Sequence, residues 1–115
     1  MNGEMLVMKA KAFVEIRKRI LKNFLDIIIL KKLKKNPSIG GYDIITIFHR
    51  NFHMLPSSGY VYSVLYRMER QGLIKGTKTS EKRVYILTEK GEEKIKNLLR
   101  QHNDIQNLVK SIFGK

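Results

Sequence analysis

The chain of 115 residues is long enough for one domain that buries roughly two-thirds of its unfolded surface. Its 23 lysines and arginines against 10 aspartates and glutamates give a net charge of +13, which makes a polyanion such as nucleic acid the leading partner class. A solvated lysine-rich surface is the alternative, and the lack of cysteine excludes disulfides, thiolate catalysis and cysteine-based zinc sites.

The N-terminal third of the chain predicts helix. Residues 1–8 have the character of a flexible tail, but from about Lys9 to Lys35 apolar residues recur every three or four positions. No glycine or proline interrupts this segment, so the pattern leaves open whether it forms one helix or two. A single helix would be about 39 Å long. Because a small domain needs less, we expect part of it to pack on something else.

A turn and a shorter helix follow. Residues 36–41 combine asparagine, proline, serine and two glycines, which is the composition of a turn. The next helix is expected at about residues 42–52, where the spacing of Ile44, Ile45 and Phe48 would bury all three side chains. A short connection then leads into another helical segment. This order is typical of a helix-turn-helix.

The segment from Ser57 to Gly72 predicts a helix with both ends marked. The Ser57 hydroxyl can accept a hydrogen bond from a backbone N–H of the first turn. Gly72 is the expected left-handed residue after the last turn, with Leu73 placed to contact Met68 as in a Schellman motif. The apolar stripe that we expect to be buried consists of Val61, Val64, Leu65 and Met68.

The opposite face of this helix carries hydroxyl and guanidinium groups and no carboxylate. Such groups suit phosphates and the edges of bases. We therefore interpret the segment as the recognition helix of a winged helix-turn-helix. The face is formed by Tyr60, Ser63, Arg67 and Arg70, with Tyr62 at its boundary.

After the recognition helix the pattern changes to strand. Residues 73–77 and 83–87 are predicted strands, and the second is rich in branched and aromatic side chains. The polar residues 78–82 connect them, so the pair would form a wing. The cations that make this wing basic are Lys75, Lys78, Lys82 and Arg83.

The C-terminal segment predicts one long amphipathic helix. Thr88 can cap it, and the glutamates that follow are favourable at the positive end of a helix dipole. The helix would run to about Phe113, and its heptad-like stripe favours a dimer seam over docking on its own domain. The dimerisation residues predicted from both terminal helices are Phe13, Ile16, Ile20, Ile95, Leu98, Leu99, His102, Ile105, Val109, Ile112 and Phe113.

Four pieces of the sequence, in this order of elements, resemble the PadR family of winged-helix repressors. They are GYDII at residues 41–45, SSGYVY at 57–62, LYRMERQGLI at 65–74 and RVYILTEKG at 83–91. The resemblance implies a homodimeric transcriptional regulator, usually a repressor, that dimerises through its terminal helices.

The expected fold is mainly α with a small β-ribbon, an α+β winged helix-turn-helix with long terminal dimerisation helices. Three parts are predicted: a flexible tail at residues 1–8, a DNA-binding domain at 9–88 that includes the N-terminal helix, and a dimerisation helix at 89–115. The predicted function is sequence-specific binding of double-stranded DNA by a homodimer that regulates transcription.

The predicted DNA contacts divide by chemistry. The start of the recognition helix would bind phosphate through free N–H groups, whereas Tyr60 and Ser63 would reach the floor of the groove. Arg67 and Arg70 would contact backbone phosphate, the alternative being a pair with Glu69 or solvent. The wing cations would reach the minor groove or flanking phosphates, the alternative being a solvated hairpin tip. Tyr62 is either a phosphate contact, as the resemblance implies, or a partly buried aromatic. The full set is Ser57, Ser58, Gly59, Tyr60, Tyr62, Ser63, Arg67, Arg70, Lys75, Lys78, Lys82 and Arg83.

The sequence gives little support to catalysis or to a bound cofactor. Phosphate loops and nucleophile elbows are absent, so we expect a protein that is not an enzyme. His49 and His53 have a spacing that can place two imidazoles on one metal, but no third ligand lies near them in the sequence, and no metal is predicted. His102 would be a polar, register-setting member of the dimer seam.

Several expectations concern partners and location. The longest apolar run, residues 27–30, is too short to span a membrane, and the N-terminus lacks the apolar core of a signal peptide, so we expect a cytoplasmic protein without membrane contact. A dimer groove lined by Phe13, Ile16, Leu99 and Phe113 could admit a small apolar effector, although the same residues fit a closed seam. The alternatives to a specific regulator are a protein-interaction module, a nonspecific or architectural nucleic-acid binder, and an RNA-binding protein.

Overall fold

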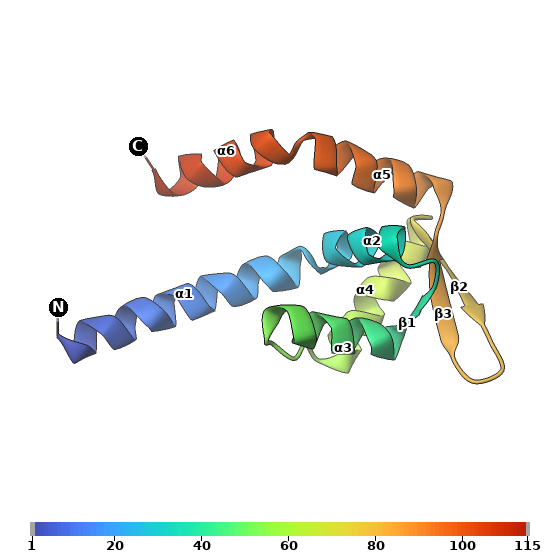
Figure 1. Ribbon diagram of the computed structural model, residues 1–115, viewed down its shortest axis with the longest axis horizontal. Helices are drawn as coiled ribbons and strands as arrows, with labels where there is room; N and C mark the ends of the chain where they lie inside the picture. The colour runs from blue at the N-terminus through green and yellow to red at the C-terminus, as the bar shows by residue number, and fades with distance from the viewer. Residues whose placement is uncertain (1, 115) are drawn as a thin grey trace.

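The computed structural model of the chain describes residues 2–114, which form six helices and a three-stranded antiparallel sheet (Figure 1). This confirms the predicted mainly helical α+β class with a winged helix-turn-helix. The elements are α1 (Gly3–Asn23), α2 (Leu25–Lys35), β1 (Ile39–Gly40), α3 (Gly41–Phe52), α4 (Ser58–Arg70), β2 (Ile74–Lys78), β3 (Arg83–Leu87), α5 (Glu89–Arg100) and α6 (His102–Phe113).

The core lies where α2, α3, α4, α5 and the base of the ribbon meet. The four residues predicted to form the buried stripe of α4 are all buried, which confirms that prediction. Ile44 and Phe48 of α3 are buried as expected, whereas Ile45 is only half-buried. The other buried apolar residues are Leu21, Leu25, Ile29, Leu30, Leu33, Ile39, Leu73, Ile74, Tyr85 and Ile95.

Both ends of α4 follow the predicted capping chemistry. The Ser57 hydroxyl accepts a hydrogen bond from the Tyr60 N–H at 3.2 Å. At the other end Gly72 has φ +76°, its N–H donates to the Glu69 carbonyl at 2.9 Å, and the Leu73 N–H donates to the Met68 carbonyl at 3.0 Å. These two bonds define a Schellman motif. The helix that presents the candidate site therefore begins and ends where local sequence dictates.

The N-terminal segment forms two helices, separated at Phe24, where φ is −105° and ψ is 17°. Four apolar side chains of α2 enter the core, whereas Leu21 is the buried residue of α1, so packing redirects the chain at this point. The flexible tail predicted for residues 1–8 is wrong for residues 3–8, which belong to α1; Met1 lies outside the described residues. Asn2 caps this helix by accepting from the Met5 N–H at 2.8 Å.

The C-terminal segment is also divided, although one helix was predicted. The Thr88 hydroxyl caps α5 as expected, accepting from the Gly91 N–H at 3.1 Å. The helix then breaks at Gln101, where φ is −92° and ψ is 14°. Packing explains the correction: α5 lies against α2, whereas α6 buries none of its residues.

The sheet has the order β1-β3-β2. The central strand β3 pairs with β2 along its whole length, and residues 74–78 replace the 73–77 predicted for the first wing strand. Strand β1 was predicted as part of a turn. It pairs Ile39 with Tyr85 on the open edge of β3, and the burial of Ile39 accounts for this short addition.

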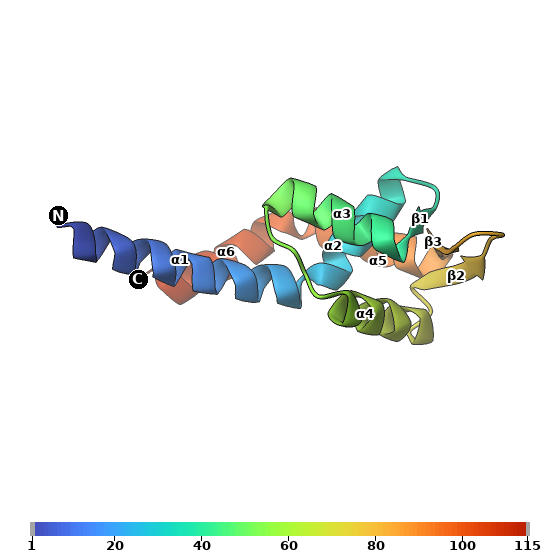
Figure 2. The same cartoon turned by 90° about the horizontal axis from the view of Figure 1, so that it is seen from below.

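The molecule is elongated, with extents of 56 × 31 × 21 Å. Figures 1 and 2 show α1 and α6 leaving the body on the side opposite the wing. We call these two helices the arms. Within residues 2–114, no helix combines the length and the apolar character needed to cross a membrane.

Candidate nucleic-acid interface

The outward face of α4 is formed by Ser63, Tyr66 and Arg70. The Tyr66 side chain is 62% exposed, and the Arg70 guanidinium lies 5.0 Å from the centre of its ring. The sequence reasoning missed Tyr66, although its spacing from Ser63 and Arg70 by three and four residues places it on their helical face. The arrangement presents a stacking surface, a hydroxyl and a cation to solvent.

Tyr60 and Arg67, which were predicted to share that face, lie on the side of α4 that contacts the N-terminal helices. The Tyr60 hydroxyl donates to the Lys22 carbonyl at 2.8 Å, and the Lys22 ammonium lies 5.1 Å from the ring centre. Arg67 is 3.8 Å from the Asp26 carboxylate of α2. The Tyr60 hydroxyl is therefore engaged with α1, whereas Arg67 stays exposed beside α2, and its contact with DNA stays a prediction.

The start of α4 is open to solvent. Ser57, Ser58 and Gly59 are exposed, and a Cβ at Gly59 would meet nothing within 4 Å. This end of the helix also carries the positive end of its dipole, with no acidic residue in the first turn. The position is therefore accessible and free of negative charge in the first turn, and phosphate binding there stays a prediction.

The four predicted wing cations form two groups that differ in whether a carboxylate lies close to them. Lys75 and Lys78 are exposed, and no carboxylate in residues 2–114 forms a salt bridge with either. Lys82, in contrast, lies 2.8 Å from the Asp43 carboxylate, and Arg83 lies 2.9 Å from that of Glu69. The sequence did not predict these two ion pairs: Glu69, expected as a partner of Arg67 or Arg70, pairs with Arg83.

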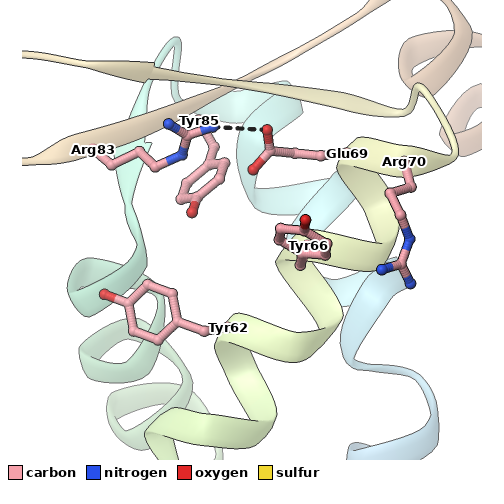
Figure 3. A pocket seen from close by; sticks show the side chains of 6 residues that line it. All are labelled: Tyr62, Tyr66, Glu69, Arg70, Arg83 and Tyr85. Atoms are coloured by element: carbon pink, nitrogen blue, oxygen red, sulfur yellow. Dashed lines mark hydrogen bonds and ion pairs between the residues drawn. The ribbon is translucent and has the colours of Figure 1, made fainter.

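A groove of about 580 Å³ separates α4 from the wing (Figure 3). In this view the Glu69 carboxylate points to Arg83, and the Tyr85 ring lies between Arg83 and Tyr62. Burial raises the pKa of the Tyr85 phenol, and the nearby Glu69 carboxylate adds to the effect. Sequence reasoning missed Glu69 and Tyr85 here because the contacts join distant segments. The lining consists of Tyr62, Tyr66, Glu69, Arg70, Arg83 and Tyr85.

Tyr62 is the partly packed aromatic that was one of the two interpretations, and contact of its hydroxyl with phosphate stays a prediction. Its side chain is partly exposed at the groove, and its ring covers the backbone of Gly41 at the start of α3. A Cβ at Gly41 would lie only 2.6 Å from the ring, so glycine is required there by the close approach. The phenol is thus held in place beside the outward face of α4.

Most of the predicted dimerisation residues are exposed on the arms and on α5. Three of them are not exposed. Ile95 is fully buried in the core against the monomer's own helices, so its predicted place in a dimer seam is wrong. Ile16 and Leu98 are half-buried. His102 is exposed, with its Nε2 atom 3.1 Å from the Gln106 amide nitrogen. The exposed members are Phe13, Ile20, Leu99, His102, Ile105, Val109, Ile112 and Phe113.

The part of the chain that the structure describes contains no cluster of three histidine, aspartate or glutamate side chains that could hold a metal ion. His49 and His53 lie in the last turn and at the C-cap of α3, where His53 adopts φ 52°. In the structure, His53 is therefore the residue that ends α3 as its C-cap.

An exposed helix beside a basic β-ribbon, supported by a helix-turn-helix, defines a winged-helix protein. The chain belongs to the PadR-like family of transcriptional regulators, whose model matches residues 29–97, more than half of its length. The matched region includes α3, α4, the wing and the body of the core. No match was found among curated proteins.

Solved structures are similar to the chain over most of its length. A PadR-like transcriptional regulator from Bacillus cereus strain ATCC 14579 is 25% identical, with a TM-score of 0.70, covering 84% of this chain and 98% of that one. A PadR family regulator from Clostridium difficile R20291 is 27% identical, with a TM-score of 0.64 and coverages of 79% and 99%. Bacillus subtilis PadR in complex with operator DNA is 26% identical, with a TM-score of 0.58 and coverages of 65% and 46%.

Proposed function

We propose that this protein is a homodimeric transcriptional repressor that binds double-stranded DNA sequence-specifically. The observation that carries the proposal is the outward face of α4, where Ser63, Tyr66 and Arg70 are exposed together beside the wing. The complex of Bacillus subtilis PadR with operator DNA supports it, since that protein shares the fold at 26% identity. The net charge of +13 suits a polyanionic partner.

The contacts divide by position on this surface. Ser63, Tyr66 and Arg70 would enter the major groove, because they lie on the exposed face of the recognition helix. The open start of α4 would bind a phosphate, as helix N-termini with free N–H groups do. Lys75 and Lys78 on the wing would contact flanking phosphates or the minor groove. Base contacts from α4 would supply specificity, and the cations most of the affinity.

The arms would form the dimer. Their exposed side chains include Phe13 on α1 and both Ile112 and Phe113 on α6, an apolar surface that a lone soluble domain rarely displays. A second copy of the chain would cover it and would space two recognition helices about 34 Å apart, one turn of duplex DNA. Repression is what the family resemblance implies, and an apolar effector between the arms stays a prediction.

Fluorescence anisotropy tests the proposal. A labelled duplex carrying the DNA upstream of the protein's own gene is compared with a scrambled duplex at two salt concentrations. We expect tighter binding to the native duplex at both, with a log–log salt slope of several units. Equal affinities that collapse together as salt rises would reduce the function to nonspecific binding.

A protein-interaction module is the second candidate, and the exposed apolar arms are the observation that favours it. Such a module would capture a protein partner tightly and bind both duplexes weakly. Because hydrophobic association is insensitive to salt in comparison with phosphate binding, the salt series separates the two candidates.

A further inference from the structure

Lys82, which directly precedes β3, and Arg83, the first residue of β3, are ion-paired to different helices. The Arg83 guanidinium donates to the Glu69 carboxylate of α4 at 2.9 Å (Figure 3). The Lys82 ammonium donates to the Asp43 carboxylate of α3 at 2.8 Å. Since successive side chains of an extended segment point to opposite sides, the ribbon is held from both.

A glycine lies directly beneath the side chains of each ion pair. A Cβ at Gly76 would lie 2.5 Å from the Arg83 Nε atom, and a Cβ at Gly40 would lie 3.0 Å from the Asp43 carboxylate and 3.2 Å from the Lys82 side chain. Gly40 has φ −78°, and Gly72 is the glycine with positive φ within residues 2–114, so neither position needs glycine for its backbone. The missing side chains leave the space that the two cations occupy.

Arg83 and Asp43 each have a further neighbour besides their ion-pair partner. Its guanidinium lies 5.9 Å from the centre of the buried Tyr85 ring, which Glu69 faces across the groove. The Asp43 carboxylate also accepts from the Gly40 N–H at 3.1 Å, which fixes it at the start of α3. The Asp43 carboxylate is therefore positioned by more than its cation, whereas Glu69 is held by Arg83. Solvent-exposed ion pairs contribute little energy individually.

A carboxylate beside a DNA-binding surface repels phosphate, so its presence here needs a reason. We propose that Asp43 and Glu69 are positioning residues that determine specificity: they hold the wing at a fixed place relative to α4 and keep Lys82 and Arg83 from binding phosphates of any sequence. This inference rests on the proposed DNA-binding function. It assigns to Lys82 and Arg83 a role different from the phosphate contacts that the sequence predicts.

The variant Glu69→Gln tests the proposal because it keeps the shape of the side chain and releases Arg83. One added phosphate contact steepens the salt slope by about 0.9, which is about fivefold tighter binding at 0.15 M salt. We expect this gain on a scrambled duplex and a smaller one on the native duplex, so that the ratio of the two affinities falls. Asp43→Asn should act in the same direction through Lys82.

Two further variants separate position from charge. Glu93→Gln removes the same charge from the exposed surface of α5, away from the wing, and should leave the salt slope and the affinity ratio near those of the unaltered protein. Gly76→Ala changes no charge but places a methyl group where the Arg83 guanidinium lies. It should lower the affinity ratio as Glu69→Gln does.

Hydrogen–deuterium exchange of the protein without DNA supplies a readout that is independent of binding. Amides of residues 77–84 should exchange faster in Glu69→Gln and Asp43→Asn than in Glu93→Gln. The proposal is overturned if the first two variants match Glu93→Gln in both exchange and salt slope. If the unaltered protein does not distinguish the duplexes, the proposed function and the specificity role fail together, while exchange still decides whether the ion pairs hold the wing.

Discussion

Gly91 decides how closely the C-terminal helix docks on the base of the wing. It is buried in the first turn of α5, and a Cβ there would lie 2.0 Å from the Leu73 carbonyl oxygen and 3.0 Å from a Leu87 methyl group. The obstructing atom belongs to the backbone of Leu73, the residue before β2, so a change of rotamer cannot relieve the contact. The variant Gly91→Ala must therefore displace α5.

Three effects set the free-energy cost of Gly91→Ala. Overpacking of this kind costs about 1–3 kcal/mol. The displacement also weakens the hydrogen bond from the Thr88 N–H to the Leu73 carbonyl, 3.2 Å long, for about 1 kcal/mol more. Alanine recovers about 1 kcal/mol through its helix propensity. We expect a net loss of about 2 kcal/mol in the free energy of unfolding, or roughly 10 °C in Tm.

Urea unfolding followed by circular dichroism at a fixed protein concentration measures this loss. With an m-value of about 1–1.5 kcal/mol per M, the midpoint should fall by roughly 1.5 M. Gly59→Ala is the matched control, because it lies in the first turn of α4 with nothing within 4 Å of the added Cβ. It should raise stability by about 0.5 kcal/mol. An unchanged or raised midpoint in Gly91→Ala would refute the close docking of α5.

Three other predictions concern the site and the arms. Tyr66→Ala should weaken binding to the native duplex by about 1–3 kcal/mol, the contribution of a contact to a base edge in the major groove, whereas Tyr60→Phe should leave it nearly unchanged, since that hydroxyl bonds to Lys22; anisotropy measures both. Ile112→Ser should weaken the dimer about tenfold or more, as sedimentation equilibrium would report, because it removes an exposed apolar anchor of α6. Hydrogen bonding to Lys82 lowers the pKa of Asp43. The contact is therefore fully formed above the ordinary pKa of 3.8 and is lost as pH falls through the lower pKa of the folded protein. An NMR titration of the Asp43 carboxylate should show its pKa return upward in Lys82→Gln.

Each of these has a contrary result. Equal losses in Tyr66→Ala and Tyr60→Phe would mean that the DNA-reading face is rotated from the one described. Ile86→Ser alters an apolar side chain on β3 that is also exposed, and a dimer weakened equally by it and by Ile112→Ser would remove the arms as the interface. An Asp43 pKa that is the same with and without Lys82 would deny their contact in solution.

The parts of the fold that local chemistry determines could be predicted from the sequence. Ser57, Gly72 and Thr88 mark helix ends through capping bonds between residues no more than five positions apart. The breaks at Phe24 and Gln101 could not be predicted in this way, because neither has a glycine or proline and both arise where one helix enters the core and its neighbour leaves it.

The candidate site was predicted in outline but not in orientation. An apolar stripe fixes which side of α4 is buried, yet the remaining side chains divide between solvent and α1 according to packing that the stripe does not reveal. Tyr66 was therefore missed and Tyr60 was placed on the wrong side. The ion pairs of Lys82 and Arg83 join residues 39 and 14 positions apart, a separation at which sequence alone gives no pairing.

Hydroxyl-radical footprinting on the DNA upstream of the gene tests the central claim most directly, because it reports specificity and dimeric binding together. A dimer with two recognition helices should protect two patches of backbone related by approximate two-fold symmetry and centred about one helical turn apart. Ile112→Ser should weaken both patches together. Uniform protection along the duplex, or one patch whose strength ignores Ile112→Ser, would contradict sequence-specific binding by a dimer.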